Sequence, residues 1–228
     1  MKGLFISGAS TGVGKTFVTR ALAAAFKAQS RRVAAIKPVE TGMKDEESSD
    51  AAALARACGR PEVAHDPGFY RGKLPVSPYA ATLEGEPAPP PVRTLVDAVH
   101  RASRGAELTL VEGAGGLLVP LDRHVTMAEL AAALGLPVLL VAPNSLGVLS
   151  SVLCAAESAR ERSLELRAVV LVDGEGPEVD PSVHTNARIL DERLGTPVFE
   201  FPRTPDSDEA LAGAAISSGL LAALLDAR

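Results

Sequence analysis

Tryptophan is absent from this chain of 228 residues, which also has only two tyrosines and six phenylalanines. Proteins that bind single-stranded nucleic acids stack successive bases on aromatic side chains. So few rings count against a platform of that kind, and equally against a lectin-like groove. Because 46% of the residues are nevertheless hydrophobic, the core must be built from aliphatic side chains.

Cysteine and histidine are also scarce. Cys58 and Cys154 form no CxxC pair and lie in segments of helical pattern, where we expect them to be buried as small apolar residues. This excludes a disulfide framework and favours a reducing compartment. The histidines show no HxxxH or HExxH spacing, so we expect them on the surface or in loops rather than on a metal. They are His65, His100, His124 and His184.

Positive charge is not in excess, because 28 acidic residues outnumber 23 basic ones. The formal net charge of −5 provides no global field that would attract DNA or an anionic membrane, so any anion site must be local. The longest apolar runs are too short to span a bilayer, and the N-terminal run soon meets Gly8, unlike a signal peptide. We expect a cytoplasmic protein without nucleic-acid or membrane partners.

Short apolar runs alternate with longer helical patterns along the chain. The pattern predicts strands at 3–7, 32–37, 107–112, 137–142, 167–172 and 198–201. It predicts helices at 15–28, 50–58, 92–103, 127–134, 148–162 and 182–194, with further helices at the C-terminal end. Strands that are apolar on both faces and separated by helices favour an α/β fold, a doubly wound, mostly parallel sheet with helices on both faces.

A single domain is expected over residues 1–228. The proline-rich segment 87–91 is the one break in composition, and it is too short for an interdomain linker. Segment 62–74 shows no clear periodicity. It forms either a lid over a substrate or a surface loop, and we favour the loop.

The strongest signal is GASTGVGKT at residues 8–16, which follows the first expected strand and opens the first expected helix. Its glycines let backbone amides turn inward around phosphate oxygens. Lys15 can reach the β and γ phosphates, and the Thr16 hydroxyl can bind Mg²⁺. The motif differs from the standard phosphate loop, because Ala9 stands where a glycine is expected and Gly8 comes one place earlier. This difference marks a subclass.

Three more polar segments follow expected strands, where a doubly wound sheet binds its ligands. Lys37 opens the run KPVETG and is either a charge that faces a transferred phosphoryl group or a solvated edge residue. Asp50 follows two serines and is either a metal ligand or part of a helix cap. Glu112 is either a metal ligand or the first residue of a plain glycine-rich turn. Together with Thr16, these two carboxylates provide the hard oxygen ligands that Mg²⁺ prefers.

In this order, the segments resemble those of the dethiobiotin synthetases, the ATP-dependent ring-closing enzymes of biotin synthesis. The resemblance covers most of the chain, and the ordered set is more specific than any one piece. The matching pieces are 8–16, 37–42, 49–51, 77–78 with 80–81, 111–116, 126–129, 146–147 and Pro202.

The resemblance implies the fold of the P-loop nucleoside triphosphatases and a reaction in three steps. CO₂ adds to 7,8-diaminopelargonate to give a carbamate, ATP phosphorylates the carbamate, and the second amine closes the ring as phosphate leaves. It implies Mg²⁺ as cofactor, ATP as co-substrate, and a homodimer in which the substrate tail extends toward the second subunit. Charge stabilisation and orientation would drive such a reaction without a histidine acid.

The resemblance also assigns roles to residues of this chain. It implies that Lys37, Lys15 and Thr11 are catalytic and that Thr16, Asp50 and Glu112 bind the metal. The implied substrate contacts are Thr11, Lys37, Thr41, Pro78, Leu146 and Gly147. The implied nucleotide contacts are Gly12, Val13, Gly14, Lys15, Thr16, Phe17, Asp50, Glu112, Gly113, Ala114, Gly115, Asp173, Gly174, Pro202, Arg203 and Thr204.

Two positions depart from the family pattern. Relatives often carry lysine before the Leu-Gly pair and polar or histidine residues after it, whereas this chain has Ser145 and then VLSS. Relatives also commonly have an asparagine that pairs with adenine where this chain has Asp173. A carboxylate only accepts hydrogen bonds and suits the two donors on the edge of guanine, so we predict a base preference that is relaxed or shifted away from ATP. With so few rings, we expect hydrogen bonds and aliphatic contacts near Asp173 and Pro202 to hold the base.

Other functions use a similar loop. Partition and cell-division ATPases place a second lysine where this chain has Ser10, and they tend to carry a membrane helix or a basic DNA face that this chain lacks. Cobyrinic acid amide synthases need an additional glutaminase domain, for which 228 residues leave no room. A regulatory relative that binds nucleotide without ligase activity is the third alternative.

Overall fold

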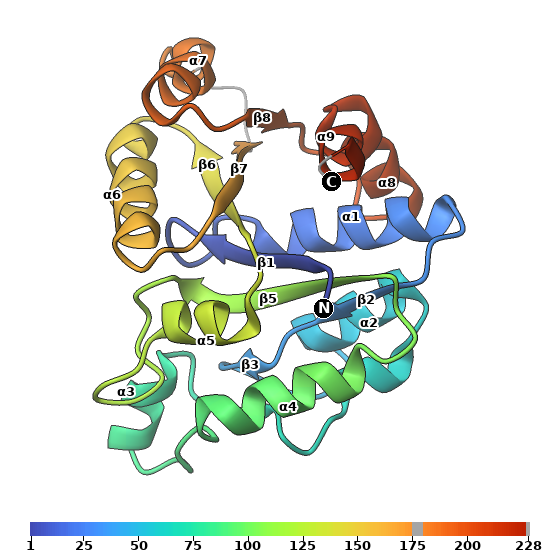
Figure 1. Ribbon diagram of the computed structural model, residues 1–228, viewed down its shortest axis with the longest axis vertical. Helices are drawn as coiled ribbons and strands as arrows, with labels where there is room; N and C mark the ends of the chain where they lie inside the picture. The colour runs from blue at the N-terminus through green and yellow to red at the C-terminus, as the bar shows by residue number, and fades with distance from the viewer. Residues whose placement is uncertain (175–179, 227–228) are drawn as a thin grey trace.

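Six parallel strands form the central sheet of the computed structural model, which describes residues 1–174 and 180–226 (Figure 1). In spatial order they are β2 (Val33–Ile36), β5 (Leu108–Gly116), β1 (Gly3–Gly8), β6 (Val138–Asn144), β7 (Leu166–Asp173) and β8 (Val198–Phe201). Every pairing within this sheet is parallel. The carboxyl ends of these strands therefore meet at one edge, where such sheets bind ligands.

Helices lie on both faces of the sheet. Val170 and Val172 of β7 belong to the large apolar cluster that includes α1 and α8, whereas Val169 and Leu171 pack with α6 and α7. This alternation confirms the predicted doubly wound, mostly parallel fold. The helices are α1 (Lys15–Ala28), α2 (Asp50–Cys58), α3 (Pro78–Leu83), α4 (Val92–Ala102), α5 (Met127–Leu134), α6 (Val148–Glu161), α7 (Val183–Leu194), α8 (Asp208–Ser217) and α9 (Leu220–Asp226).

The elements agree with the expected ones to within a few residues, except that β5 continues through its glycines to Gly116. Glycine is needed there because a Cβ on Gly113 would lie 2.9 Å from the ring of Phe5 on β1. Strands β6 and β7 also run further than expected, and Asn144 and Asp173 pair at their ends. The carboxyl ends of β5, β6 and β7 are therefore held in regular structure.

Segment 62–74 is not the surface loop that we favoured from the sequence. Pro61–Ala64 form a 3₁₀ helix, and β4 (Tyr70–Arg71) pairs in parallel with β3 (Val39–Glu40). Val63 is buried in the core. Strands of two residues are too short to show a period, so the sequence pattern could not reveal this pairing. The segment instead packs beside the residues that follow β2.

Cys58 is buried as expected, but the prediction that Cys154 is buried is wrong. Buried positions on α6 recur at Val152, Ala156 and Ala159, and Cys154 falls off that stripe. All four histidines are exposed. No helix among the described residues is both long enough and apolar enough to cross a membrane.

Candidate functional site

The loop between β1 and α1 depends on its glycines. Gly12 and Gly14 have φ angles of 74° and 94°, in the left-handed region that favours glycine. Gly14 is the N-cap of α1, and no side chain caps this helix. The first amides of α1 are therefore available to an outside acceptor, and the helix dipole favours an anion there.

The shifted first glycine of the motif has a steric cause. A Cβ on Gly8 would lie 2.5 Å from the carbonyl oxygen of Ser10 and 2.9 Å from the side chain of Val13. The tight turn thus requires glycine at position 8, one place earlier than in the standard loop. This accounts for the departure seen in the sequence.

Lys15 lies over this loop and is buried. Among the described residues, its Nζ makes a single hydrogen bond, a long one of 3.4 Å to the carbonyl of Ser10. Burial lowers the pKa of Lys15, and the neighbouring Lys37 acts in the same direction, while the carboxylates of Glu112 and Asp50 oppose both. A buried ammonium with such weak bonding is well suited to a phosphate oxygen.

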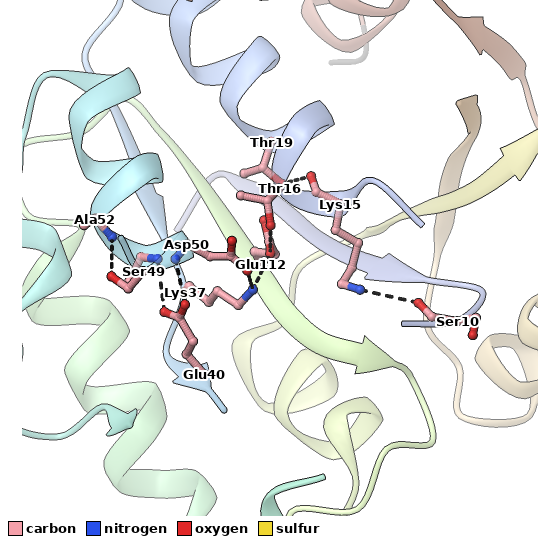
Figure 2. A network of polar contacts seen from close by, with 11 residues as sticks. Ser10, Lys15, Thr16, Thr19, Lys37, Glu40, Ser49, Asp50, Ala52 and Glu112 are labelled. Carbon is pink, nitrogen blue, oxygen red and sulfur yellow. Dashed lines mark hydrogen bonds and ion pairs between the residues drawn. The ribbon is translucent and has the colours of Figure 1, made fainter. Parts of the chain in front are cut away.

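Lys37, one residue beyond the end of β2, is the centre of a buried network (Figure 2). Its Nζ donates to Glu112 Oε1 at 2.8 Å and forms a short contact with Asp50 Oδ2. The hydroxyl of Thr16 donates to the same Glu112 oxygen at 2.8 Å. Burial alone would lower the pKa of Lys37, but the carboxylates of Glu112 and Asp50 raise it above its ordinary value. The lysine therefore stays charged although it is almost inaccessible to water.

Glu40 holds the start of α2 and was missed in the sequence. It is buried, and its two carboxylate oxygens accept from the backbone amides of Asp50 at 2.6 Å and Ala51 at 3.1 Å. Ser49 caps the same helix through a bond from Ala52. A carboxylate near a helix N-terminus is stabilising, but Glu40 lies ten positions before Asp50, so no local pattern indicated this role.

The oxygens of this network suit a magnesium ion. Glu112 is fully buried, and its Oε2 has no hydrogen-bond partner among the described residues. A buried carboxylate oxygen without a partner is costly, and a cation would relieve that cost. The Thr16 hydroxyl and the Asp50 carboxylate lie in the same network, so the donor set consists of hard oxygens. The three predicted ligands therefore fit Mg²⁺.

A cavity of about 340 Å³ brings most of the predicted catalytic and phosphate-binding residues together. It joins the phosphate loop to the ends of β2 and β5 and to the start of α2. Its lining consists of Thr11, Gly12, Val13, Gly14, Lys15, Thr16, Phe17, Lys37, Thr41, Asp50, Glu112, Ala114 and Gly115.

A second cavity, of about 630 Å³, continues from the phosphate loop. It is lined by Thr16, Phe17, Arg20, Arg203, Thr204, Pro205 and Asp206. The guanidinium of Arg203 lies 5.4 Å from the centre of the Phe17 ring. Phe17, Arg203 and Thr204 were predicted nucleotide contacts, whereas Arg20 was not among the predicted residues.

A third cavity, an apolar groove of about 450 Å³, lies on the other side of the phosphate loop. It is lined by residues 8–11, 116–120 and one face of α6 that includes Cys154.

The remaining predicted residues lie outside these three cavities. Leu146 is 84% exposed just before α6, and Gly147 is the N-cap of that helix. Pro78 is buried at the start of α3, and Gly113 lies within β5. Asp173, Gly174 and Pro202 follow or end the outer strands β7 and β8.

Comparison with known proteins gives consistent matches over most of the chain. Residues 2–210 match the model of a family described as an AAA domain. The chain is 42% identical to the ATP-dependent dethiobiotin synthetase of Anaeromyxobacter dehalogenans over 90% of this chain and 92% of that protein. It is 40% identical to the enzyme of the same name from Caulobacter sp. over 98% and 96%, and 36% identical to that of Aquifex aeolicus over 89% and 90%.

Among solved structures, chloroplast FtsY from Physcomitrella patens superposes with a TM-score of 0.51 at 17% identity. The match covers 93% of this chain but only 64% of that protein. At this identity it supports the fold alone, which is that of the P-loop nucleoside triphosphatases.

Proposed function

This chain belongs to the family of ATP-dependent dethiobiotin synthetases, and we propose that it closes the ring through a carbamate and a carbamic-phosphoric anhydride. The observation that carries the proposal is the buried, charged Lys37 beside the phosphate loop. A fixed positive charge at this point is complementary to a carbamate and to the phosphoryl group that it receives.

The proposed reaction has three steps. An amine nitrogen of 7,8-diaminopelargonate attacks the carbon of CO₂, and loss of a proton leaves a carbamate. A carbamate oxygen attacks the γ phosphorus of ATP, the bond to the bridging oxygen breaks, and ADP leaves. The second amine then attacks the carbonyl carbon of the mixed anhydride, phosphate leaves with the electron pair of the C–O bond, and the nitrogen loses a proton.

The side chains of the smallest of the three cavities described above, the one of about 340 Å³, would orient these groups. Lys15 and the loop amides bind the triphosphate, and Lys37 lies between the carbamate and the γ phosphate. Thr11 and Thr41 line the same cavity and would hydrogen-bond the carbamate or the diamine. Preorganised donors of this kind are worth about 10²–10³ in rate each.

Thr16, Asp50 and Glu112 would hold Mg²⁺, which neutralises charge on the β and γ phosphates. The chain prepares these ligands itself. Glu40 fixes the first turn of α2 and so the backbone of Asp50, and the central position of β5 in the sheet fixes Glu112.

We further propose that the apolar groove binds the aliphatic tail of the substrate and that the enzyme is a cytoplasmic homodimer. Thr11 lines both the groove and the smallest of the three cavities, so the two adjoin at this residue. Exposed apolar side chains at Leu118 and Leu146 provide surface for a second subunit.

A phosphate-release assay with and without 7,8-diaminopelargonate and bicarbonate tests the function. The ligase releases ADP and phosphate, and forms dethiobiotin, only when both are present. Lys37→Met should lower this rate at least about 100-fold. Lys37→Arg, which keeps the charge in the network, should retain more activity than Lys37→Met. Slow hydrolysis that does not depend on the diamine would instead support an ATPase switch or a regulatory nucleotide-binding protein.

A further inference from the structure

Asp173 lies at the end of β7, beside the phosphate loop and the second cavity. Position 14 of the loop is close to β7, because a Cβ on Gly14 would lie 3.3 Å from the side chain of Val172. Arg203, which lines the second cavity, donates from Nε to the carbonyl of Asp173 at 3.0 Å. Among the described residues, no atom lies within 4 Å of a Cβ placed on Gly174, the residue that follows β7. A nucleoside that extends from the loop along the sheet edge would bring its base to this position.

A buried pair of amides holds the Asp173 carboxylate. The Nδ2 of Asn144, at the end of β6, lies 3.4 Å from Asp173 Oδ1. The Nδ2 of Asn186 on α7 donates to Asn144 Oδ1 at 3.0 Å. Asn144 is 3% exposed and Asn186 is 2% exposed. Burial of these two amide side chains costs free energy unless their polar atoms form hydrogen bonds.

The direction of these hydrogen bonds follows from the backbone. Asn186 Nδ2 also lies 3.4 Å from the carbonyl oxygen of Ser145, which can only accept. Asn186 therefore turns its amino group toward β6, and Asn144 must meet it with its carbonyl oxygen. The amino group of Asn144 is then left for Asp173. These hydrogen bonds therefore favour a side chain at position 173 that accepts a hydrogen bond from Asn144.

We propose that Asp173, oriented by Asn144 and Asn186, accepts hydrogen bonds from the nucleotide base and makes GTP at least as good a phosphoryl donor as ATP. The inference deepens the proposed function and rests on it. Guanine carries two adjacent donors, N1–H and the N2 amino group, which match two carboxylate oxygens. Adenine has one amino group next to a ring nitrogen that only accepts, so one carboxylate oxygen would face a lone pair.

The sharpest comparison is between GTP and ITP, which differ only in the N2 amino group. We expect kcat/KM for dethiobiotin formation to be about tenfold higher with GTP, the worth of one hydrogen bond to a charged acceptor. Asp173→Asn should remove this difference and favour ATP, because the new amide would accept from Asn144 and turn its own amino group toward the base. Asp191→Asn makes the same change on the exposed side of α7 and should alter neither preference.

Asn144 and Asn186 are positioning residues in this proposal. Asn144→Leu should reduce the ratio of GTP to ITP efficiency toward one, an effect that a purely structural role would not produce. Asp173→Asn is isosteric at a half-buried position, so it keeps the proposal testable if Asn144→Leu does not fold.

Calorimetric titration of GDP, IDP and ADP with Mg²⁺, without the diamine, tests the base site independently of turnover. Tighter binding of GDP than of IDP in the wild type, but not in Asp173→Asn, supports the inference. A strong preference for ATP and ADP that is equal in the wild type and Asp173→Asn overturns it, as does equal binding of GDP and IDP. Absence of dethiobiotin with every nucleotide would reject the proposed function instead, and the binding data would still decide the role of Asp173.

Discussion

Lys37 shows how one residue can be buried and charged at once. Taking an ammonium out of water disfavours its charged form, yet two carboxylates restore it, so the pKa of Lys37 ends above its ordinary value. Each partner also has a second anchor. Thr16 donates to Glu112, and Glu40 accepts from the backbone of Asp50. The network therefore keeps its geometry before substrates arrive, which is the condition for electrostatic catalysis.

Gly115 and Gly135 form a matched pair for testing the glycine-rich end of β5. Their φ angles are 66° and 63°, so alanine at either position costs about 1–2 kcal/mol for the left-handed conformation. At Gly115 the new Cβ would also lie 2.6 Å from Val119 and 3.3 Å from the hydroxyl of Thr11, whereas at Gly135 it would meet nothing within 4 Å. Gly115→Ala should lower the free energy of unfolding by about 1–3 kcal/mol more than Gly135→Ala does, and it should also lower activity.

Urea unfolding and steady-state rates measure both effects. Gly135→Ala, at the end of α5, should keep wild-type rates because no described atom lies within 4 Å of the added Cβ. Equal losses of stability in the two variants would show that the turn near Thr11 relaxes freely around the added methyl group.

The site residues inside recognisable motifs could be predicted from the sequence. The residues that hold those side chains in position could not. The sequence placed Lys15, Thr16, Lys37, Asp50 and Glu112, and the smallest cavity collects all five. It did not indicate Glu40 as an anchor, because a helix start that is capped from another segment leaves no local pattern. Neither did it indicate the amides of Asn144 and Asn186, which are 42 positions apart and meet only when β6 and α7 pack.

At the level of elements, the N-terminus of α2 links the fold to the proposed metal site. Glu40→Gln removes a carboxylate that accepts from two backbone amides, so it should cost about 1–2 kcal/mol. It should also raise the Mg²⁺ concentration needed for half-maximal rate, because the backbone of Asp50 loses a charged anchor. Ser49→Ala removes the neighbouring cap and should cost about 1 kcal/mol, but it should change the Mg²⁺ requirement less.

Thermal or urea unfolding gives the stability of these two variants, and a Mg²⁺ titration of the rate gives the second quantity. If Ser49→Ala and Glu40→Gln raise the Mg²⁺ requirement equally, Glu40 acts only through helix stability and does not position Asp50.

The segment between the 3₁₀ helix and β4 is fastened to α4 by an ion pair that makes its stability depend on pH. Asp66 accepts from Arg101 at 2.7 and 3.0 Å, and this hydrogen bonding holds the pKa of Asp66 below its usual value. A lowered pKa in the folded state means that the stabilisation is complete above about pH 4 and is lost as pH falls through the folded-state value. Because Arg101 is exposed to solvent, which screens the ion pair, the contribution should be small.

Comparison of the wild type with Asp66→Asn tests this dependence. In urea unfolding, the wild type should be more stable than the variant at pH 6, and the difference should shrink toward pH 3. A difference that stays constant between these values would show that the Asp66 charge does not contribute.

The long helices and strands could be predicted from the periodicity of apolar residues, whereas the short strands could be identified only in the folded structure. The bounds of α2 and α5 agree with the sequence pattern because caps and apolar stripes mark them, and those of α1 agree because the phosphate loop ends where the apolar stripe begins. The pairing of β3 with β4 involves two residues from each strand and joins segments about thirty positions apart. Its place is fixed by burial of Val39 and Tyr70, which no local pattern announces.

At the scale of the whole molecule, an acidic chain concentrates its few buried cations at one edge of the sheet. The net charge is −5, yet Lys15 and Lys37 are both buried beside the same loop. A local cation pair with low accessibility is screened less by salt than surface charge. Anion binding therefore does not need a positive protein.

The proposed dimer gives the last prediction. Leu146 is 84% exposed at the end of β6, and Leu118 is 53% exposed in the lining of the apolar groove. Contiguous exposed apolar surface marks sites of protein association, and the proposed dimer would bring these two leucines into one such surface. Sedimentation of the wild type should give twice the mass of one chain.

Leu146→Asp should shift the protein toward the monomer and raise KM for the diamine, because a buried unpaired carboxylate opposes association. Ile216→Asp, at a 54% exposed position on α8, is the matched control and should leave the dimer intact. A wild-type monomer, or a Leu146→Asp variant that still dimerises, would show that this surface does not join two subunits.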